Sequence, residues 1–352
     1  MRRWQMMALR AARSIARFVR VRVSPFAPEP FAASRWGAED SARFFVGANL
    51  PWIAYGLDFG ANAWQPGGGL SAHPERLEQL DAACAALAAQ DIRLVRWFLL
   101  CDGRAGIRLE GGRIPVGLDD WTCRDIDAAL DAVQRHGLRL LFVLFDFYWC
   151  RPARMARGGV RLGGLRQVIR EPALRDALLQ QVVSPLFRRY GSHPAIFGWD
   201  LFNEPEWVTL GLDGWHPRGV VSPQVMRAFL RDAAWQARTE TRQLVTVGLA
   251  SARGLDLCRG LPLDFHQVHW YDYMEADAPL ARDVAELGLD RPVVLGEFPT
   301  RGSRRSTDRL LRLAEQAGYR GALLWSVRSH DAASDWAAAQ AALTHWRRDA
   351  MA

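Results

Sequence analysis

The chain alternates short apolar runs with longer amphipathic segments from about residue 43 onward. Short continuous apolar runs are typical of buried strands, whereas apolar residues that recur at every third or fourth position are typical of helices. The runs that we interpret as strands are 44–48, 92–98, 138–144, 196–202, 243–248, 264–269, 292–296 and 321–325. The segments that we interpret as helices are 74–90, 121–136, 171–190, 223–240, 304–317 and 332–346, with shorter ones near 252–259 and 278–288. This alternation predicts an α/β fold.

The order of these elements predicts the architecture. Strands that alternate with helices form a parallel sheet, because each helix returns the chain to the edge where the next strand begins. Eight such units close a (β/α)8 barrel, and a chain of 352 residues can hold one as a single domain. The alternative, an open doubly wound sheet, usually begins with a glycine-rich phosphate-binding turn, whereas the first strand here leads into Asn49-Leu50-Pro51-Trp52. We therefore predict one TIM-barrel domain over residues 41–348.

Residues 1–40 form a separate arm before the barrel. Apolar residues from Trp4 to Phe18 recur at steps of three and four, with arginines on the other side, which predicts a basic amphipathic helix. The arginines interrupt every apolar stretch that could form the core of a secretory signal. We expect the helix to pack on the barrel or to fray, and weak contact of residues 1–22 with an anionic membrane surface is the alternative. Three prolines within 25–30 then form a stiff connector.

The basic charge of the chain does not indicate a nucleic-acid partner. The formal net charge is +7, and none of the 45 basic residues is a lysine. Of this net charge, +5 comes from residues 1–40, which hold eight arginines against Glu29, Glu39 and Asp40. The barrel is thus close to neutral and lacks the basic field that nucleic-acid binding needs. No nucleic acid is expected among the partners.

Cysteine usage and hydropathy bear on the cellular compartment. The five cysteines are scattered and odd in number, without a C-x-x-C pair, which argues against a disulfide framework or a zinc site. No apolar run approaches the roughly 18 to 20 residues of a membrane-spanning helix. We therefore expect a cytoplasmic location, with the inner membrane face as the alternative.

Two glutamates follow predicted strands at the positions where barrel enzymes carry their chemistry. The fourth strand ends in Asn203-Glu204-Pro205 and the seventh in Gly296-Glu297-Phe298. Because the carboxyl ends of all strands meet at one face, we expect these carboxyl groups to face each other across the barrel mouth. A carboxylic acid that protonates the leaving oxygen and a carboxylate that attacks the anomeric carbon are the equipment of a retaining glycosidase. This chemistry needs no metal and no organic cofactor, and none is predicted.

Other kinds of barrel site fit the residues less well. His266 and His269 have a spacing seen in metal sites, but on a strand these positions face opposite sides, so a shared metal is not expected. A barrel isomerase or aldolase would need a glycine-rich phosphate site after the last two strands or a Schiff-base lysine, and the chain has no lysine. Asp200 lies within the fourth strand and is interpreted as structural.

From about residue 43 to residue 346 the chain resembles glycoside hydrolases of clan A, and family 5 in particular, which contains cellulases and mannanases. In that clan the acid/base is the glutamate of an Asn-Glu-Pro at the end of strand four, which matches Glu204. The nucleophile ends strand seven in a Gly-Glu-Phe or similar, which matches Glu297. The resemblance implies that Asn203 holds the sugar 2-hydroxyl, a contact that strengthens in the transition state.

Further matches fall in order on the other strands. An arginine late in strand two resembles Arg96, and a His-x-Tyr after strand six resembles His269 and Tyr271. A tryptophan at the end of strand eight resembles Trp325, which would form an apolar floor beneath the sugar. The resemblance implies that Arg96 and the Tyr271 hydroxyl keep the nucleophile ionised, and that His269 orients neighbouring groups.

Two features after the strands concern the substrate. Family 5 members often carry a histidine at the end of strand three, where this chain has Asp146, so either Asp146 replaces a sugar contact or the chain belongs to a neighbouring family.

Sugars stack on aromatic rings through their apolar C–H faces, and tryptophans are dense after the predicted strands. We expect about half of them to bind sugar and the rest to pack the barrel lip. They are Trp52, Trp64, Trp149, Trp207, Trp215 and Trp270.

The sequence thus predicts a retaining β-glycoside hydrolase that cleaves a β-linked oligo- or polysaccharide through a covalent glycosyl-enzyme. Two alternatives stay open. A catalytically silent barrel would bind polysaccharide without cutting it, and a transglycosylase would use the same residues with a sugar acceptor in place of water.

Overall fold

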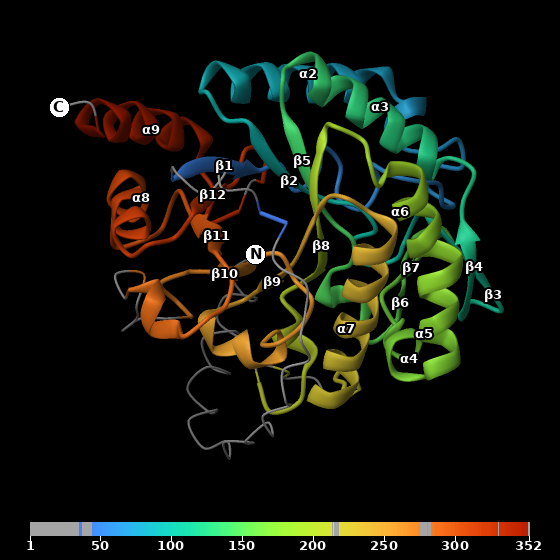
Figure 1. The fold of residues 1–352 in the computed structure, drawn as a ribbon. Helices are drawn as coiled ribbons and strands as arrows, with labels where there is room; N and C mark the ends of the chain where they lie inside the picture. The colour runs from blue at the N-terminus through green and yellow to red at the C-terminus, as the bar shows by residue number, and fades with distance from the viewer. Residues whose placement is uncertain are drawn as a thin grey trace.

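Eight parallel strands form a closed barrel with helices around it in the computed structural model (Figure 1). The structure describes residues 35–36, 44–212, 214, 218–274, 280, 283–329 and 331–350. The predicted arm therefore lies outside the described residues, apart from residues 35 and 36. The closed ring of strands confirms the predicted (β/α)8 barrel and rules out an open doubly wound sheet.

The barrel strands coincide closely with the predicted ones. They are β1 (Phe45–Asn49), β2 (Leu94–Phe98), β5 (Arg139–Val143), β8 (Ile196–Asn203), β9 (Leu244–Leu249), β10 (His266–His269), β11 (Val293–Pro299) and β12 (Gly321–Trp325). Strand β1 pairs with both β2 and β12, and these two pairings close the ring. In the ring order, β8 stands four places from β12, so the carboxyl ends of these two strands lie on opposite sides of the barrel mouth.

Helices cover the outer face of the barrel (Figure 1). Helix α7 starts where Pro223 supplies a preset backbone angle, and the Ser222 hydroxyl accepts a hydrogen bond from the Val225 amide. Among the described residues no helix combines the length and apolar character that a bilayer span requires. The long helices are α2 (Pro74–Ala89), α3 (Thr122–Arg135), α7 (Pro223–Glu240), α8 (Thr307–Gln316) and α9 (Trp336–Ala350). Short 3-10 turns are η1 (Leu70–Ala72), η2 (Phe147–Trp149), η3 (Arg157–Gly159), η5 (Pro205–Val208), η6 (Ala252–Leu257) and η7 (Val284–Leu287).

The helix predicted over 171–190 is interrupted. It consists of α5 (Pro172–Leu178), a π-helical turn η4 (Leu179–Val183) and α6 (Ser184–Tyr190), and the short α4 (Arg166–Arg170) precedes it. Pro185 lacks the amide hydrogen that a regular α-helix would donate one turn back, and its ring crowds that turn. A π-helical turn relieves this conflict, so the interruption follows from one residue that the amphipathic pattern did not take into account.

Two hairpins in the loops at the barrel mouth were not predicted. Strands β3 (Ile107–Glu110) and β4 (Ile114–Leu118) pair antiparallel in the loop after β2, and β6 (Arg154–Met155) pairs with β7 (Arg161–Leu162) after β5. Gly111 and Gly112 connect the first pair with positive φ angles of 57° and 68°. A Gly-Gly pair between two short strands is a recognised hairpin signal, so this hairpin could have been found from the sequence.

The interior of the barrel changes from apolar to polar along its axis. At the amino-terminal ends of the strands, Leu94, Leu141 and Leu323 fill the interior, and Trp36 packs edge-on against Phe265 with ring centres 5.0 Å apart. Two residues further along β2, on the same face, Arg96 is fully buried inside the barrel. A layer of buried polar side chains therefore lies between these apolar residues and the barrel mouth, and it supports the residues at the mouth.

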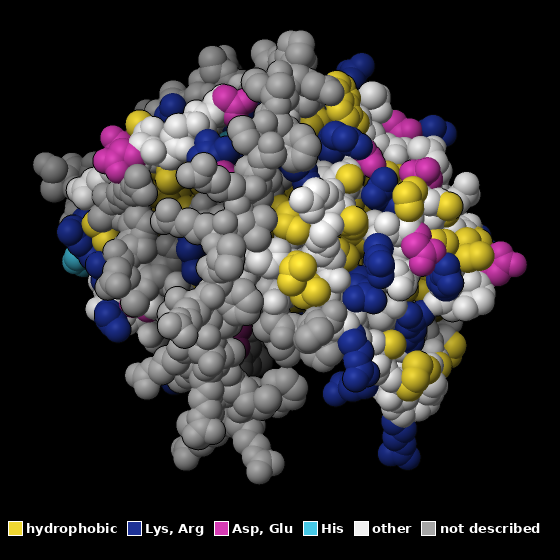
Figure 2. All heavy atoms as spheres, turned by 90° about the horizontal axis from the view of Figure 1, so that it is seen from below, with side chains coloured by type: hydrophobic (Ala, Val, Ile, Leu, Met, Phe, Trp, Pro, Cys, Tyr) yellow, Lys and Arg dark blue, Asp and Glu magenta, His cyan; other side chains and the backbone are white. Residues whose placement is uncertain are grey.

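Many arginines of the barrel surface are held in ion pairs. On the face drawn in Figure 2, arginine side chains lie among hydrophobic and uncharged ones. Arg188 pairs with Glu240 at 3.0 Å, and Arg175 pairs with Asp232 at 3.2 Å. Such pairs keep the local charge balanced although the composition is rich in arginine.

Candidate active site

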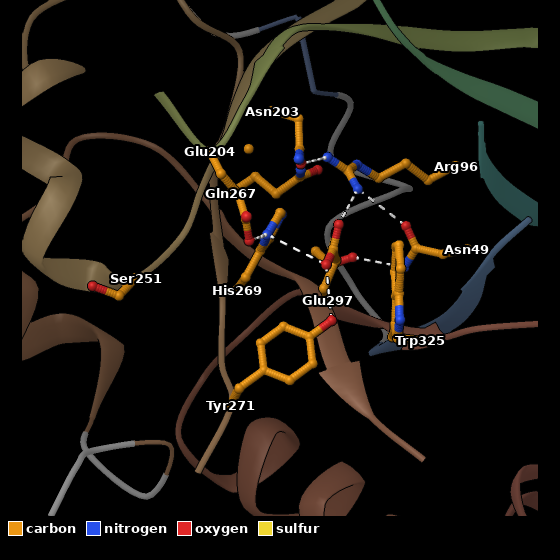
Figure 3. Close-up of polar contacts among 12 residues, drawn as sticks. Asn49, Arg96, Asn203, Glu204, Ser251, Gln267, His269, Tyr271, Glu297 and Trp325 are labelled. Carbon is orange, nitrogen blue, oxygen red and sulfur yellow. Dashed lines mark hydrogen bonds and ion pairs between the residues drawn. The ribbon is translucent and has the colours of Figure 1, made fainter. Parts of the chain in front are cut away.

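The structure brings Glu204 and Glu297 together at the barrel mouth, with His269 between them (Figure 3). Each of the three presents one oxygen or nitrogen atom, and these atoms all lie within 4.8 Å of one another. Retaining glycosidases separate their two carboxyl groups by about 5 to 5.5 Å, whereas inverting enzymes leave room for a water at about 6.5 to 9.5 Å. The observed closeness fits the retaining geometry.

A sharp turn positions Glu204 at the end of β8. Glu204 adopts a left-handed backbone conformation, with φ 49° and ψ 55°, and its amide donates to the Gly248 carbonyl at 2.7 Å. The following Pro205 favours an extended conformation at Glu204, so the left-handed conformation is imposed by the surrounding structure. A left-handed conformation costs about 1 to 3 kcal/mol for a residue other than glycine, and it is retained here where the carboxyl group faces the site.

Two side chains hold the Glu204 carboxyl group. Trp207 donates from Nε1 to Oε2 at 2.8 Å, and Nδ1 of His269 lies 2.9 Å from Oε1. Only 15% of the Glu204 side chain is exposed. The acid/base candidate therefore has a defined orientation while one edge of its carboxyl group stays accessible, as proton exchange with a substrate requires.

Glu297 is more deeply buried than Glu204 and is in contact with a cation. The Arg96 guanidinium donates from Nη1 to Oε1 at 2.5 Å, and the Tyr271 hydroxyl donates to Oε2 at 2.8 Å (Figure 3). Both contacts were predicted from the resemblance. Burial nevertheless has the largest effect and raises the pKa of Glu297 above its ordinary value, while His269, Arg96 and the Tyr271 hydrogen bond act in the opposite direction.

Arg96 connects the site to the polar layer below it. The side chain is fully buried, and each of its five N–H groups has an acceptor. Nε and Nη2 bond Asp200 at 3.0 and 2.9 Å, Nη2 bonds Asn203 at 2.7 Å, and Nη1 bonds Asn49 at 3.1 Å and Glu297 at 2.5 Å. With no donor left over, the guanidinium is fixed in one orientation and fixes Glu297 in turn.

Asn203 is held at both ends of its amide group. Its Oδ1 accepts from Arg96, and its Nδ2 donates to Asp146 Oδ2 at 2.8 Å. Asp146 also accepts a bond from the Tyr148 amide at 2.8 Å, and burial raises its pKa to about 8. Because Arg96 is a donor and Asp146 an acceptor, the orientation of the Asn203 amide is determined. The second N–H of Asn203 can then donate to a sugar hydroxyl.

His269 is a neutral base in a buried position. Burial lowers its pKa to about 4, so near neutral pH the ring carries a single N–H. Its Nε2 has no hydrogen-bond partner among the described residues, whereas Nδ1 faces Glu204. The bond can run in either direction: Nδ1–H donates when Glu204 is ionised, and Nδ1 accepts when Glu204 carries the proton. His269 therefore suits both protonation states of the acid/base candidate, which agrees with the orienting role expected for it.

Two predicted sugar-binding tryptophans are buried instead. Trp270 lies between His269 and Tyr271, and because side chains alternate along an extended chain it points away from the site into the core, with 4% of its surface exposed. Trp149 ends the turn η2, packs edge-on against Phe145 at 4.6 Å and is fully buried. The prediction that these two residues contact the substrate is therefore wrong, and both pack the barrel lip.

Trp325, Trp52 and Trp207 lie at the barrel mouth. Trp325 and Trp52 are partly exposed and pack edge to face with ring centres 6.3 Å apart, and the peptide bond that follows Trp325 is cis. Trp207 is partly exposed and donates to Glu204, so it positions the carboxyl group as well as offering an aromatic face. Trp215 lies outside the described residues.

Several residues that support the site were not predicted. Asn49 donates to the carbonyl groups of Gly296 and Leu324 and accepts from Arg96, and its position at the end of the first strand was the available signal. Asp200, interpreted as structural, accepts three bonds from Arg96 and Gln267 beneath the site. A Cβ at Gly248 would lie 2.7 Å from Asp200 and 2.8 Å from Arg96, so only glycine fits at that position.

The arrangement bears on metal binding as well. Glu204, His269 and Glu297 have the spacing of a possible cation site. The Arg96 guanidinium already neutralises Glu297 from 2.5 Å, and a second cation beside it would be repelled. His266, which was not expected to share a metal with His269, lies 3.3 Å from Asp290 and is not part of this group.

Comparison with known proteins finds β-mannanases that are similar to this chain. No protein-family model matches the chain. The mannan endo-1,4-β-mannosidase of Mytilus edulis is 24% identical over 322 residues, which cover 80% of this chain and 83% of that protein. The solved β-mannanase structure from Mytilus edulis has a TM-score of 0.70 and 21% identity, covering 86% of this chain and 91% of that one. The endo-1,4-β-mannanase of Eisenia fetida has a TM-score of 0.70 and 22% identity, covering 87% and 91%.

The fold and the paired carboxyl groups define a glycoside hydrolase, the class of enzyme that the sequence predicts. These relatives are β-mannanases, so the predicted resemblance to mannanase-like glycoside hydrolases is confirmed.

Proposed function

We propose that the protein hydrolyses β-1,4-linked mannan by the retaining mechanism, with Glu204 as acid/base and Glu297 as nucleophile. The observation that carries this proposal is the approach of the two carboxyl groups to within 4.8 Å, one partly exposed and the other buried against Arg96. Carboxyl groups this close have no room for a water molecule between them and the sugar, so direct attack by Glu297 is favoured.

In the first step a Glu297 oxygen attacks the anomeric carbon from the face opposite the leaving group. The bond between this carbon and the glycosidic oxygen breaks, and the oxygen takes the proton of Glu204. The products are a covalent glycosyl-enzyme on Glu297 and a free sugar hydroxyl. Arg96 and Tyr271 hold the attacking carboxylate in place, so little reorganisation accompanies the step.

In the second step the roles of the two carboxyl groups reverse. The Glu204 carboxylate takes a proton from water, the water oxygen attacks the anomeric carbon, and the bond to Glu297 breaks. The sugar leaves with its original β configuration. The contact between His269 and Glu204 suits this cycle, because the bond persists whether or not Glu204 carries the proton.

The relatives support mannan as the polymer. Mannose and glucose differ only in the orientation of the 2-hydroxyl, and the free N–H of Asn203 is the group that we assign to this hydroxyl. Because Arg96 and Asp146 fix the amide, its direction is set before the sugar binds. Asn203 is thus the residue that we expect to contact the part of the sugar that distinguishes mannose.

The test is reducing-sugar release from β-mannans, β-glucans and xylan by the wild-type protein and by Glu297→Gln. We expect release from β-mannan that falls by several orders of magnitude in the variant. The exposed Glu315 on the outer helix α8 provides the control Glu315→Gln, and this variant should keep full activity. Preference for another polymer would overturn the mannan assignment, and activity that survives Glu297→Gln would overturn the mechanism.

A further inference from the structure

A row of partly exposed planar side chains leads from the candidate reaction centre to the molecular surface. Trp325 packs against Trp52, with ring centres 6.3 Å apart, and Trp52 packs against Tyr55 at 4.8 Å. The Arg104 guanidinium then lies over Tyr55, 4.6 Å from the ring centre, and 5.7 Å from the ring centre of Trp64. The row ends at Trp64, which is 42% exposed.

Trp64 is exposed and yet firmly held. Its indole Nε1 donates to the Arg157 carbonyl at 2.5 Å, and its amide donates to the Asn62 side chain at 2.8 Å. The backbone at Gly158 lies so close that a Cβ there would sit 3.4 Å from two atoms of the indole ring. A tryptophan with an exposed surface gains little by being fixed unless something binds to it, and a rigid aromatic face is what the apolar C–H side of a sugar stacks on.

The side chain of Arg104 is also held in one orientation by hydrogen bonds. It bonds Asp102 through two parallel contacts, Nε to Oδ1 at 2.9 Å and Nη2 to Oδ2 at 2.7 Å, and 12% of its side chain is exposed. Nη1 also donates to the Tyr55 carbonyl at 3.4 Å, and the two remaining guanidinium hydrogens can donate to a ligand. Next to an aromatic face, an oriented donor of this kind suits the equatorial and axial hydroxyls of a sugar ring.

The two ends of the row can be placed relative to the two halves of the bound polysaccharide. Strand β12, which ends in Trp325, lies across the barrel from β8, which carries Glu204. The acid/base must face the glycosidic oxygen, so the leaving half of the substrate lies on the Glu204 side. Trp325 thus lies on the side of the other half, and from it the row runs along the loops after β1 and β2 to Trp64, whose indole bonds Arg157 in the loop after β5.

We propose that Trp64, together with Arg104, forms a remote subsite that binds a sugar unit of the polymer several units away from the cleaved bond. This inference rests on the proposed function, because it takes a β-1,4-linked mannan chain as the ligand. The subsite lengthens the bound segment of polymer and favours long substrates over short ones, without contact with the reacting atoms.

The test compares a long and a short substrate. Trp64→Ala is expected to lower kcat/KM for mannohexaose roughly tenfold, mostly through KM, since tenfold corresponds to about 1.4 kcal/mol, which is within the range of one aromatic contact. Hydrolysis of an aryl β-mannobioside, which is too short to reach Trp64, should change less than about twofold, and Trp64→Phe should recover part of the loss. Trp235 on α7, 41% exposed, gives the matched control Trp235→Ala, which should alter neither substrate.

The outcomes separate the subsite from the proposed function. Equal losses of kcat/KM on both substrates, or no loss on mannohexaose, would overturn the subsite while the wild-type activity on mannan stands. A wild-type protein that cleaves neither mannan nor manno-oligosaccharides would overturn the proposed function, and the subsite with it. Calorimetric binding of mannohexaose to Glu297→Gln, with and without Trp64→Ala, should show the same roughly tenfold difference in affinity.

Discussion

Asn203 donates a hydrogen bond to Asp146 across the ends of two neighbouring strands, at 2.8 Å, where the family 5 pattern often has a histidine. Arg96 donates to the oxygen of the Asn203 amide, and Asp146 accepts from its nitrogen. The remaining N–H of Asn203 therefore points in a fixed direction. Asp146, which stands where the family pattern often has a histidine, therefore supports the site by orienting Asn203.

Removal of this support should slow the chemical step. In Asp146→Ala the Asn203 amide loses a buried partner, worth about 1 to 3 kcal/mol, and kcat should fall about 10- to 100-fold with a smaller change in KM. Steady-state kinetics on mannohexaose measures both constants. The exposed Asp131 on α3 supplies the control Asp131→Ala. An unchanged kcat in Asp146→Ala would show that Asn203 does not depend on Asp146.

The pH dependence of the reaction should respond to Tyr271. The nucleophile must be ionised, so kcat/KM falls as the pH drops through the pKa of Glu297, and the Tyr271 hydroxyl lowers that pKa. In Tyr271→Phe the acid limb of the kcat/KM profile should move to higher pH, by about one unit or less. The neighbouring Tyr273, whose ring centre lies 5.5 Å from that of Tyr271, provides the control Tyr273→Phe. A limb that stays in place or moves to lower pH would contradict the hydrogen bond as a stabiliser of the carboxylate.

The role of Glu204 should depend on the leaving group. In Glu204→Gln, release of an alcohol from β-mannan loses its proton donor, and the rate should fall about 100- to 10,000-fold. A dinitrophenyl β-mannoside leaves as a stable anion without a proton, so its first step should survive and a burst of dinitrophenolate should precede slow turnover. Rapid-mixing absorbance measurements detect the burst. Equal loss on both substrates would remove Glu204 as the acid.

Glu206 is expected to make the folded state less stable as the pH rises. Burial raises its pKa to about 8, so between its ordinary value, about 4.3, and 8 the folded state binds more protons than the unfolded state. The free energy of unfolding therefore decreases with increasing pH across this window. Glu206→Gln stays neutral and should match the wild type near pH 4, below this window, and exceed its stability at pH 8. Thermal or urea unfolding at the two pH values measures the difference, and a variant that is equally destabilised at both would contradict this account.

The sequence predicts the barrel and the two facing glutamates because both depend on local patterns. Apolar runs define the strands, and in a closed parallel ring every strand end reaches the same face, so Glu204 and Glu297 meet whatever the loops do. His269 and Tyr271 follow from the same rule, since residues two apart on an extended chain share a side.

Features that depend on turns and on long-range packing were not predictable in the same way. Trp149 follows a strand just as Trp52 does, but the turn at Phe147–Trp149 directs its ring into the core. The bonds of Asn49 and Asp200 to Arg96 join residues that are far apart in the chain, and no local pattern marks them. Raised pKa values at Asp146 and Glu206 likewise arise from burial that only the folded structure shows.

The most direct test of the central claim is to trap the glycosyl-enzyme. A 2-deoxy-2-fluoro β-mannoside with a good leaving group slows both steps and the second more, so the intermediate should accumulate. Mass spectrometry of the intact protein and of its peptides should then show one sugar bound to Glu297. No adduct together with release of an α-configured product, or an adduct on another residue, would contradict the retaining mechanism proposed for this site.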